Sequence, residues 1–485
     1  MKYNRYILYL VFFSKSIFIG CSYEFPSEQK NFSFGSTDFD KFVIVGDEFS
    51  SGYMDGALYD EGQANSIPAI IARQLQEVKK IAFNQPNINS INGYNERATQ
   101  NDQIKGRYVY SYSTPDTLFP NIESTLGELP TPYTGEKSLL NDFSVPGIKI
   151  FQTLDPRLVE NIYFARFALY PDESSVLSDA MLSEPTFLLL WLGNNDVLNY
   201  AIQGAIGNNR PAPDPDQIGK TDLTPQEVFE QSFDEVLKYI NQNGNCQVIV
   251  INLPNFLLFP YFTVIPHDFL TLTNEERGYL TNFYRRFNET IYWYNFGRPS
   301  EQRRPFIDFP EDLLTHRIVI EDESLPDVFY SDGTPVPKIR QIEQDELVLL
   351  SLPRDQILTP GLGTTIGVPN KFILQDIEIE EIEDRITSLN IIISTTVQKY
   401  SSTVALIDMF SIIREFVQNR VVVDGLPICP NMELNGAFSL DGIYFNQRGN
   451  AFMANKIIMQ INERFDASIP YVNINNFRGN YFTLH

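Results

Sequence analysis

Four short, largely apolar runs separated by amphipathic stretches limit the folds that are open to this chain. The runs are residues 41–46, 185–193, 246–254 and 404–410. Strands that are apolar along their whole length are typical of a parallel sheet covered on both faces, because neither side of such a strand meets water. The sequence therefore predicts a three-layer α/β fold with a central parallel sheet.

The segments between these runs carry apolar residues at helical spacing. Thr224 and Pro225 mark the beginning of one such segment, because threonine caps helices and proline is tolerated at the first helical position. Parallel strands need crossover connections of this kind, and we expect the helices to cover the sheet. The predicted helices are residues 66–78, 224–244, 379–401 and 446–465.

Two long stretches interrupt the alternation. Residues 77–140 are rich in Asn, Thr, Pro and Tyr without a clear period, so we expect a long loop or a small excursion. Residues 255–370 mix helical and extended fragments. Because loops of this length usually are functional or carry their own structure, we predict an inserted lid beside the carboxyl edge of the sheet. The α/β domain is then divided into residues 39–254 and 371–485.

The balance of charges excludes one class of partner. The chain of 485 residues holds 61 Asp and Glu against 37 Lys and Arg, a formal net charge of −24. A nucleic-acid partner requires a basic face that neutralises phosphates, so we expect none. With three histidines, three cysteines and no metal-type cluster, we expect no metal and no cofactor.

The N-terminus has the features of a secretory signal. Lys2 and Arg5 precede a broken apolar core that Lys15 interrupts, and "FIGC" ends at Cys21. The interruption disfavours a permanent transmembrane helix. "FIGC" resembles a bacterial lipobox, which predicts a signal peptide over residues 1–20 and a diacylated cysteine. A plain secretory signal with an incidental cysteine is the alternative.

Acylation would anchor the chain to a membrane through a short tether. Residues 21–38 are polar enough to serve as that tether. Ser22 stands where many lipoproteins retained at the inner membrane have aspartate, so we expect the outer membrane, with the displayed face left open. A complex with outer-membrane proteins is a further expectation. Cys246 and Cys429 either pair or remain as free thiols.

Four motifs lie at or beside the ends of the predicted elements. They are "GDEF" at 46–49, "VPGIKI" around Gly147, "LGNND" at 192–196 and "DGIYFNQRG" from Asp441. The carboxyl ends of parallel strands meet at one edge of a sheet, where ligands bind. We therefore expect these motifs to share one pocket.

In this order the motifs resemble the four sequence blocks of the SGNH, or GDSL, hydrolases. The match is more specific to the lipoproteins of this family from Bacteroidota and covers roughly residues 40–475. The resemblance implies a flavodoxin-like sandwich and an ester-hydrolysing site. In such a site a serine attacks, a histidine takes its proton and an aspartate orients the histidine.

Carried over position by position, most of the family's groups are present. Gly147 and Asn195 match the donors that hold the oxyanion. Asp441 matches the orienting acid, and Asp47 matches the aspartate that flanks the nucleophile.

The two central groups are replaced. Glu48 stands where the nucleophilic serine belongs, and Tyr444 stands where the histidine base belongs. A carboxylate attacking an ester gives a mixed anhydride, which is higher in energy than an acyl-serine. A phenol with a pKa of about 10 is protonated at neutral pH and is no resting base.

The resemblance with these replacements predicts a pseudo-hydrolase. We expect the Tyr444 phenol to donate a hydrogen bond to Glu48, in place of the lost contact between serine and histidine. Asp441, without its histidine, is then expected to bond to the backbone or to water.

Other interpretations stay open at this point. An active esterase or lipase would recruit Ser50 or Ser51 as nucleophile and His316 as base. Glu48 with Asp47 or Asp441 would give a carboxylate pair for acid–base or glycosidase chemistry. A purely structural subunit of an outer-membrane assembly is the third alternative.

Overall fold

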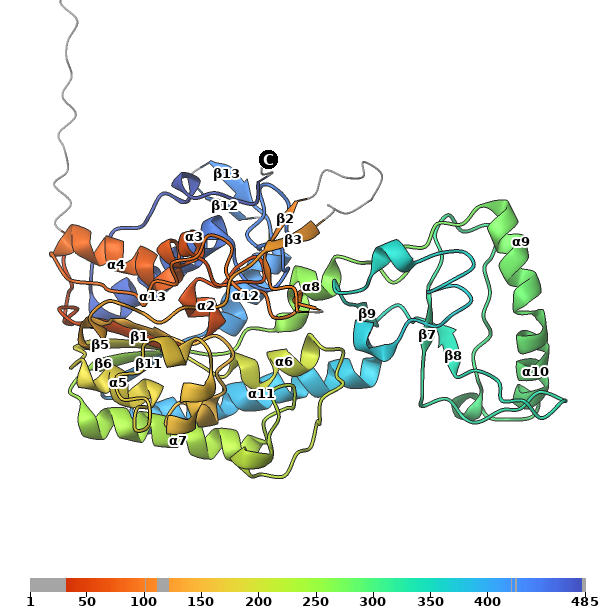
Figure 1. Ribbon diagram of the computed structural model, residues 1–485, viewed down its shortest axis with the longest axis horizontal. Coiled ribbons are helices and arrows are strands. Elements are labelled where there is room, and N and C mark those ends of the chain that lie inside the picture. Colours follow the sequence, from red (N-terminus) through yellow and green to blue (C-terminus); the bar gives the residue numbers. More distant parts are fainter. Residues whose placement is uncertain (1–31, 101, 111–121, 420, 424, 482–485) are drawn as a thin grey trace, which may run out of the picture.

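A five-stranded parallel sheet forms the centre of the protein, in the order β11-β6-β5-β1-β4 (Figure 1). The four predicted apolar runs each contain one of its strands, and every residue of β1 and β5 is buried. The predicted α/β class with a central parallel sheet is therefore confirmed. The strands are β1 (Phe42–Gly46), β4 (Asp142–Ser144), β5 (Phe187–Trp191), β6 (Gln247–Ile251) and β11 (Val404–Ile407).

Helices cover both faces of this sheet. Helices α4 and α13 pack together over one face, and α7 and α11 pack together over the other (Figure 1). Ser66 caps α4 by accepting a hydrogen bond from the Ala69 backbone N–H, and Asn446 caps α13 in the same way. The larger helices of this domain are α4 (Ile67–Val78), α5 (Val176–Leu182), α7 (Gln226–Asn243), α11 (Asp376–Lys399), α12 (Met409–Gln418) and α13 (Gln447–Phe465).

The structure is a computed structural model that describes residues 32–100, 102–110, 122–419, 421–423 and 425–481. The predicted signal peptide, Cys21 and residues 21–31 of the predicted tether lie outside these ranges. Within them, no helix combines the length and the apolar character needed to cross a membrane.

The polar stretch after α4 holds more structure than a loop. It contains an antiparallel hairpin of β2 (Lys105–Tyr110) and β3 (Ile122–Leu126). Upstream of the hairpin, residues 94–99 form a turn in which the Thr99 N–H donates to the Asn95 carbonyl. Cys246 and Cys429 are both free thiols, so they do not pair.

The stretch predicted as an insertion forms a projecting module with its own apolar core (Figure 1). Its core residues run from Ile265 to Ile373, and it adjoins the sheet domain through α8 and the beginning of α11. Its role as a lid stays a prediction. Its elements are α8 (Pro260–Thr263), α9 (Asn274–Phe283), α10 (Arg285–Asn295), β7 (Val319–Glu321), β8 (Ile339–Gln341), β9 (Leu347–Val348) and β10 (Ile373–Leu374).

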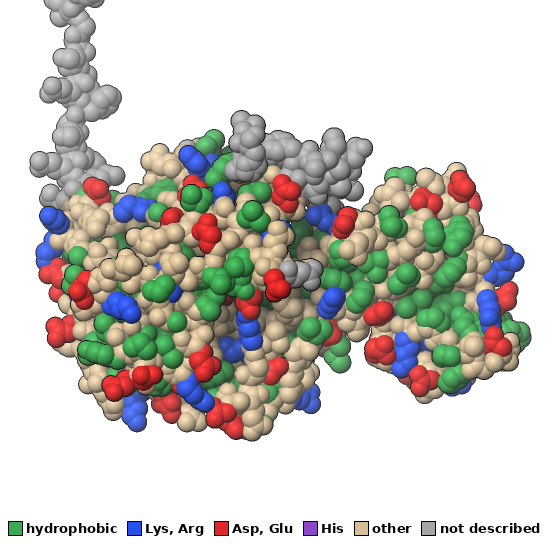
Figure 2. Space-filling model, in the orientation of Figure 1, with side chains coloured by type: hydrophobic (Ala, Val, Ile, Leu, Met, Phe, Trp, Pro, Cys, Tyr) green, Lys and Arg blue, Asp and Glu red, His purple; other side chains and the backbone are tan. Residues whose placement is uncertain are grey.

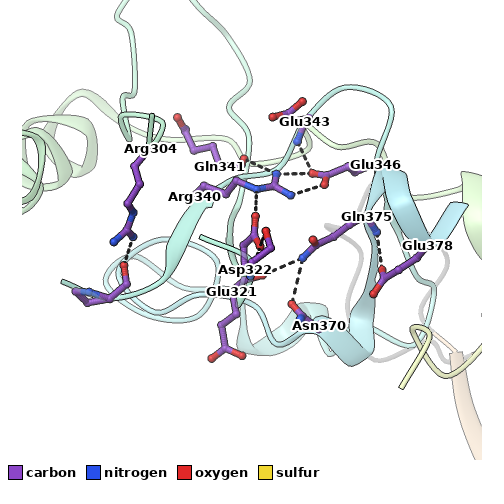
Figure 3. A network of polar contacts seen from close by, with 12 residues as sticks. Arg304, Glu321, Asp322, Arg340, Gln341, Glu343, Glu346, Asn370, Gln375 and Glu378 are labelled. Carbon is purple, nitrogen blue, oxygen red and sulfur yellow. Dashed lines mark hydrogen bonds and ion pairs between the residues drawn. The ribbon is translucent and has the colours of Figure 1, made fainter. Parts of the chain in front are cut away.

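A buried polar network lies where the projecting module meets α11 (Figure 3). The Arg340 guanidinium donates to Asp322 at 2.6 Å and to Glu346 at 2.7 Å. At the beginning of α11, the Gln375 side chain donates to the Glu321 carbonyl, and Glu378 accepts from the Gln375 backbone N–H at 2.8 Å. A buried arginine that meets two carboxylates keeps all three charges partnered, which is the condition for burying them.

Candidate functional site

Three of the predicted site residues meet at the carboxyl edge of the sheet. Glu48 is the first residue of the short helix α2 (Glu48–Ser51), directly after β1. Gly147 follows β4, and Asn195 lies in the 3-10 turn after β5. Because β1 lies between β4 and β5 in the sheet, the three turns are neighbours. Three of the four motifs therefore meet at one edge of the sheet, but of the predicted site residues only Glu48 and Gly147 line the cleft that opens there, and Asn195, Asp441 and Tyr444 do not.

The Glu48 carboxylate is held by the two groups that the sequence assigns to the oxyanion hole. Glu48 Oε1 accepts from the Gly147 backbone N–H at 2.9 Å. Glu48 Oε2 accepts from Asn195 Nδ2 at 2.7 Å. Burial raises the pKa of Glu48, and the two hydrogen bonds oppose that shift by favouring the charged form. The donors that would stabilise a transition-state oxyanion are thus occupied by the protein's own side chain.

Asp47 is bound separately from its neighbour. Its carboxylate caps α2 by accepting from the Phe49 N–H at 3.0 Å, and it accepts from Asn194 Nδ2 at 2.8 Å. Burial and then the charge of Glu48 raise the pKa of Asp47 well above its ordinary value. Each of the two carboxylates has its own donors, and those of Asp47 stabilise the turn and cap α2.

The Asp441 side chain is held by backbone groups. Its carboxylate accepts from the backbone N–H groups of Gly56 at 2.8 Å, Ile443 at 2.8 Å and Tyr444 at 2.9 Å. The expectation that Asp441 turns to the backbone is confirmed. The bond from Gly56 fixes the loop before α13 to the loop after α2, and the bonds from Ile443 and Tyr444 close the turn that Asp441 begins.

Tyr444 is buried beside Glu48. Its ring packs edge-on against Phe49 at 5.0 Å and Tyr53 at 5.1 Å between ring centroids. Burial, followed by the charge of Glu48, raises the pKa of Tyr444 well above its usual value, so the phenol stays protonated. Among the described residues its hydroxyl makes no hydrogen bond to Glu48, whose two oxygens accept from Gly147 and Asn195. The expected phenol–carboxylate bond is not formed.

The residues proposed for a rewired enzyme are not arranged as one. The Ser50 hydroxyl donates to the Asp47 carbonyl at 3.0 Å, and the Ser51 hydroxyl donates to the Glu48 carbonyl at 3.2 Å. Both serines are buried within α2. His316 precedes β7 in the projecting module and is buried against Phe309. Figure 1 shows β7 well apart from α2. The structure therefore does not bring His316 to either serine.

A cleft of about 1100 Å³ opens over Glu48. Its sides are lined by residues from three stretches of the chain, 146–163, 199–203 and 215–221. The projecting module and the segment after it contribute Tyr261, Ser351, Lys371 and Phe372. Small-molecule pockets ordinarily have volumes of roughly 300–1,000 Å³, and this cleft is at or above that range. It is therefore the natural binding site at the carboxyl edge of the sheet.

The charges of the cleft are balanced, although the chain is strongly acidic. Figure 2 shows acidic and basic side chains intermixed over the visible face of the molecule. Arg157 pairs with Asp155 and Asp216, and Lys220 pairs with Glu96. The five acidic and five basic lining residues are Glu48, Glu96, Asp155, Glu160, Asp216, Arg97, Lys149, Arg157, Lys220 and Lys371.

Arg97 is a functional candidate that the sequence did not indicate. It is accessible to solvent inside the cleft, yet protein surrounds it closely. Its positive charge lowers the pKa of Glu48 and of Asp441 against the effect of burial. Among the described residues Arg97 forms no ion pair and no hydrogen bond through its side chain. Its segment belongs to the polar stretch after α4, where no periodic pattern marks a single arginine.

Within the described ranges, no group of three or more His, Cys, Asp or Glu side chains is placed to hold a metal ion. Comparison with known protein families and with curated proteins gives no match to this chain. The case for a function therefore depends on the geometry around Glu48 and its cleft.

Proposed function

We propose that this protein is a catalytically inactive member of the SGNH-hydrolase type, a pseudo-hydrolase whose cleft binds a ligand or a partner of the cell envelope. One observation carries the proposal: the Glu48 carboxylate accepts hydrogen bonds from both oxyanion donors of the resemblance, Gly147 and Asn195. The carboxylate takes the place of the charge that would develop during ester hydrolysis.

Two chemical consequences support inactivity. Preorganised hydrogen-bond donors usually contribute more to such catalysis than any other single effect, and here the donors serve a resting carboxylate. Tyr444 keeps its proton, so no base activates a nucleophile. In serine hydrolases the loss of a triad member alone costs about 10⁴–10⁶-fold in turnover. A site that lacks both nucleophile and base therefore retains a binding function at most.

The SGNH-like fold and the lid are part of the same proposal. The order of the motifs along the chain, and the meeting of Glu48, Gly147 and Asn195 at one sheet edge, support the family resemblance. Tyr261, at the base of the projecting module, lines the cleft, which supports a lid or wall role for that module. With Cys21 acylated, the protein would act as an outer-membrane lipoprotein and as a subunit of an envelope assembly.

Ester turnover by matched variants tests the proposal. The wild-type protein should hydrolyse p-nitrophenyl acetate no faster than the Glu48→Ala variant, since neither has a nucleophile. The Glu48→Ser/Tyr444→His double variant restores the missing groups and should be the more active protein. Wild-type turnover that Ser50→Ala or Ser51→Ala abolishes would identify a rewired esterase and overturn the proposal.

A further inference from the structure

Three tyrosines and one arginine surround the part of the cleft next to Glu48. Tyr53, Tyr163 and Tyr261 line the cleft together with Arg97. The electrostatic influence of Arg97 reaches Tyr53 and Tyr261, and that of Tyr163 reaches Tyr53, which places the four side chains in one neighbourhood. This cluster is separate from the hydrogen bonds that hold Glu48 and is not used by them.

The tyrosine hydroxyls are already committed to the protein. Tyr53 donates to the Gly56 carbonyl at 2.6 Å, and Tyr261 donates to the Ile202 carbonyl at 2.8 Å. Tyr163 donates to the Tyr94 carbonyl at 3.4 Å. These bonds fix the three rings. Because Tyr163 and Tyr261 are 9% and 5% exposed, the flat apolar surface open to a ligand is mainly that of the half-buried lining residues Tyr53 and Tyr94.

Polar side chains in the same region lack partners. Asn199 lines the cleft, is 8% exposed, and its amide nitrogen has no hydrogen-bond partner in the described part of the chain. Arg97 is exposed within the cleft, and its five N–H donors have no acceptor among the described residues. The buried amide of Asn199 costs free energy while it lacks a partner, and a ligand that brings an acceptor oxygen would remove that cost.

The charge around Arg97 restricts the kind of ligand. Glu48 and Asp441 lie within electrostatic reach of the guanidinium and already balance its charge. An anionic ligand would meet the Glu48 carboxylate, which lines the cleft. An alkyl chain would desolvate the charged lining residues, including the ion pairs of Arg157 and Lys220. A neutral ligand rich in hydroxyl groups satisfies the donors without either penalty.

We infer that the cleft binds a neutral oligosaccharide, whose hydroxyl oxygens accept from Arg97 and Asn199 and whose ring faces pack on Tyr53 and Tyr94. The volume of about 1100 Å³ fits several sugar units and not one alone. This inference rests on the proposed non-hydrolytic binding function and adds the class of ligand to it.

Calorimetric titration with three probe classes tests the inference on the purified mature protein. The probes are neutral hexasaccharides built on glucose, xylose, mannose and galactose, a hexagalacturonate, and laurate. At least one neutral hexasaccharide should bind, and the acidic hexasaccharide and laurate should not. The Arg97→Ala variant should weaken that binding at least tenfold, as should Tyr94→Ala at the neighbouring lining position. The matched controls Arg464→Ala on α13 and the exposed Tyr471→Ala should leave it unchanged.

The outcomes separate the two proposals. Preference for hexagalacturonate or laurate, or no binding by any neutral hexasaccharide, overturns the ligand class while the protein stays a pseudo-hydrolase. Neutral binding that neither cleft variant weakens overturns the assigned site. Hydrolysis of p-nitrophenyl acetate by the same wild-type preparation overturns the proposed function itself, whatever the sugar data show.

Discussion

At the scale of single residues, the conformation of Glu48 is the feature that sequence alone could not supply. The resemblance places Glu48 where a serine would stand, and the motifs predict Gly147 and Asn195 at neighbouring strand ends. That the carboxylate turns into both donors depends on side-chain geometry after folding. The absence of a bond from Tyr444 to Glu48 depends on that geometry too.

Removing the Glu48 carboxylate should leave a site that binds a free carboxylate from solution. Glu48→Ala leaves the Gly147 N–H without an acceptor and the Asn195 amide with the Ile148 carbonyl alone, which costs roughly 1–3 kcal/mol of folding stability. Formate or acetate should then raise the Tm of the variant by binding to these donors, with little effect on the wild type. Thermal unfolding in acetate and in chloride at equal ionic strength measures this difference.

The control for this experiment is Glu463→Ala, a change at an exposed position of α13. It should respond to acetate as the wild type does. An equal acetate effect on all three proteins would contradict the assignment of Gly147 and Asn195 as an anion-binding pair.

At the scale of elements, the parts that the sequence predicts are those with a single, strong pattern. Strands β1, β5, β6 and β11 are apolar for most or all of their length, and the long helices have clear periods. The predicted cap of α7 is wrong, because that helix begins after Pro225 and Thr224 makes no capping bond. The sequence does not predict strand β4, because its three residues "DFS" carry no strand signal and pair only once they meet β1. The sequence does not predict the β2–β3 hairpin for a related reason: its strands are defined by tertiary contacts and not by an alternation of apolar and polar residues.

The first turn of α11 should give folding a specific pH dependence. Burial, and then the charges of Glu346 and Glu381, raise the pKa of half-buried Glu378 from 4.5 to about 7. Between these values the folded state binds more protons than the unfolded state, so this contribution to stability falls as pH rises from 4.5 to 7. Above pH 7 it is constant.

Urea unfolding of the wild type and of Glu378→Gln at half-unit pH steps measures the effect. Glutamine keeps an acceptor for the Gln375 N–H and removes the titration. The clearest window is pH 6–7, above the values of about 6 for Asp55, Asp142 and Asp196. Parallel profiles of the two proteins in that window would contradict the assignment.

At the scale of the whole molecule, the sequence indicates the division into parts better than the site they enclose. It predicts the stretch 255–370 as an insertion, and the structure gives that region a separate apolar core. The cleft is not predictable as a volume, because its walls come from stretches far apart in the chain. Its balanced charges cannot be deduced from a net charge of −24.

The membrane attachment is a property of the whole chain that can be measured directly. The resemblance of "FIGC" to a lipobox predicts a mature protein that begins at a diacylated Cys21. Mass spectrometry of the membrane fraction should find that modified N-terminus, and Cys21→Ser should release the protein from the membrane. An unmodified N-terminus produced by cleavage elsewhere would contradict lipidation.

Labelling of the wild-type protein with a serine-reactive fluorophosphonate tests the central claim most directly. Glu48 occupies the oxyanion donors, and Ser50 and Ser51 donate to backbone carbonyls without a base beside them. The account predicts no labelled peptide after prolonged incubation, by intact-mass and peptide mass spectrometry. Stoichiometric labelling at Ser50 or Ser51 would show an activated nucleophile and contradict it.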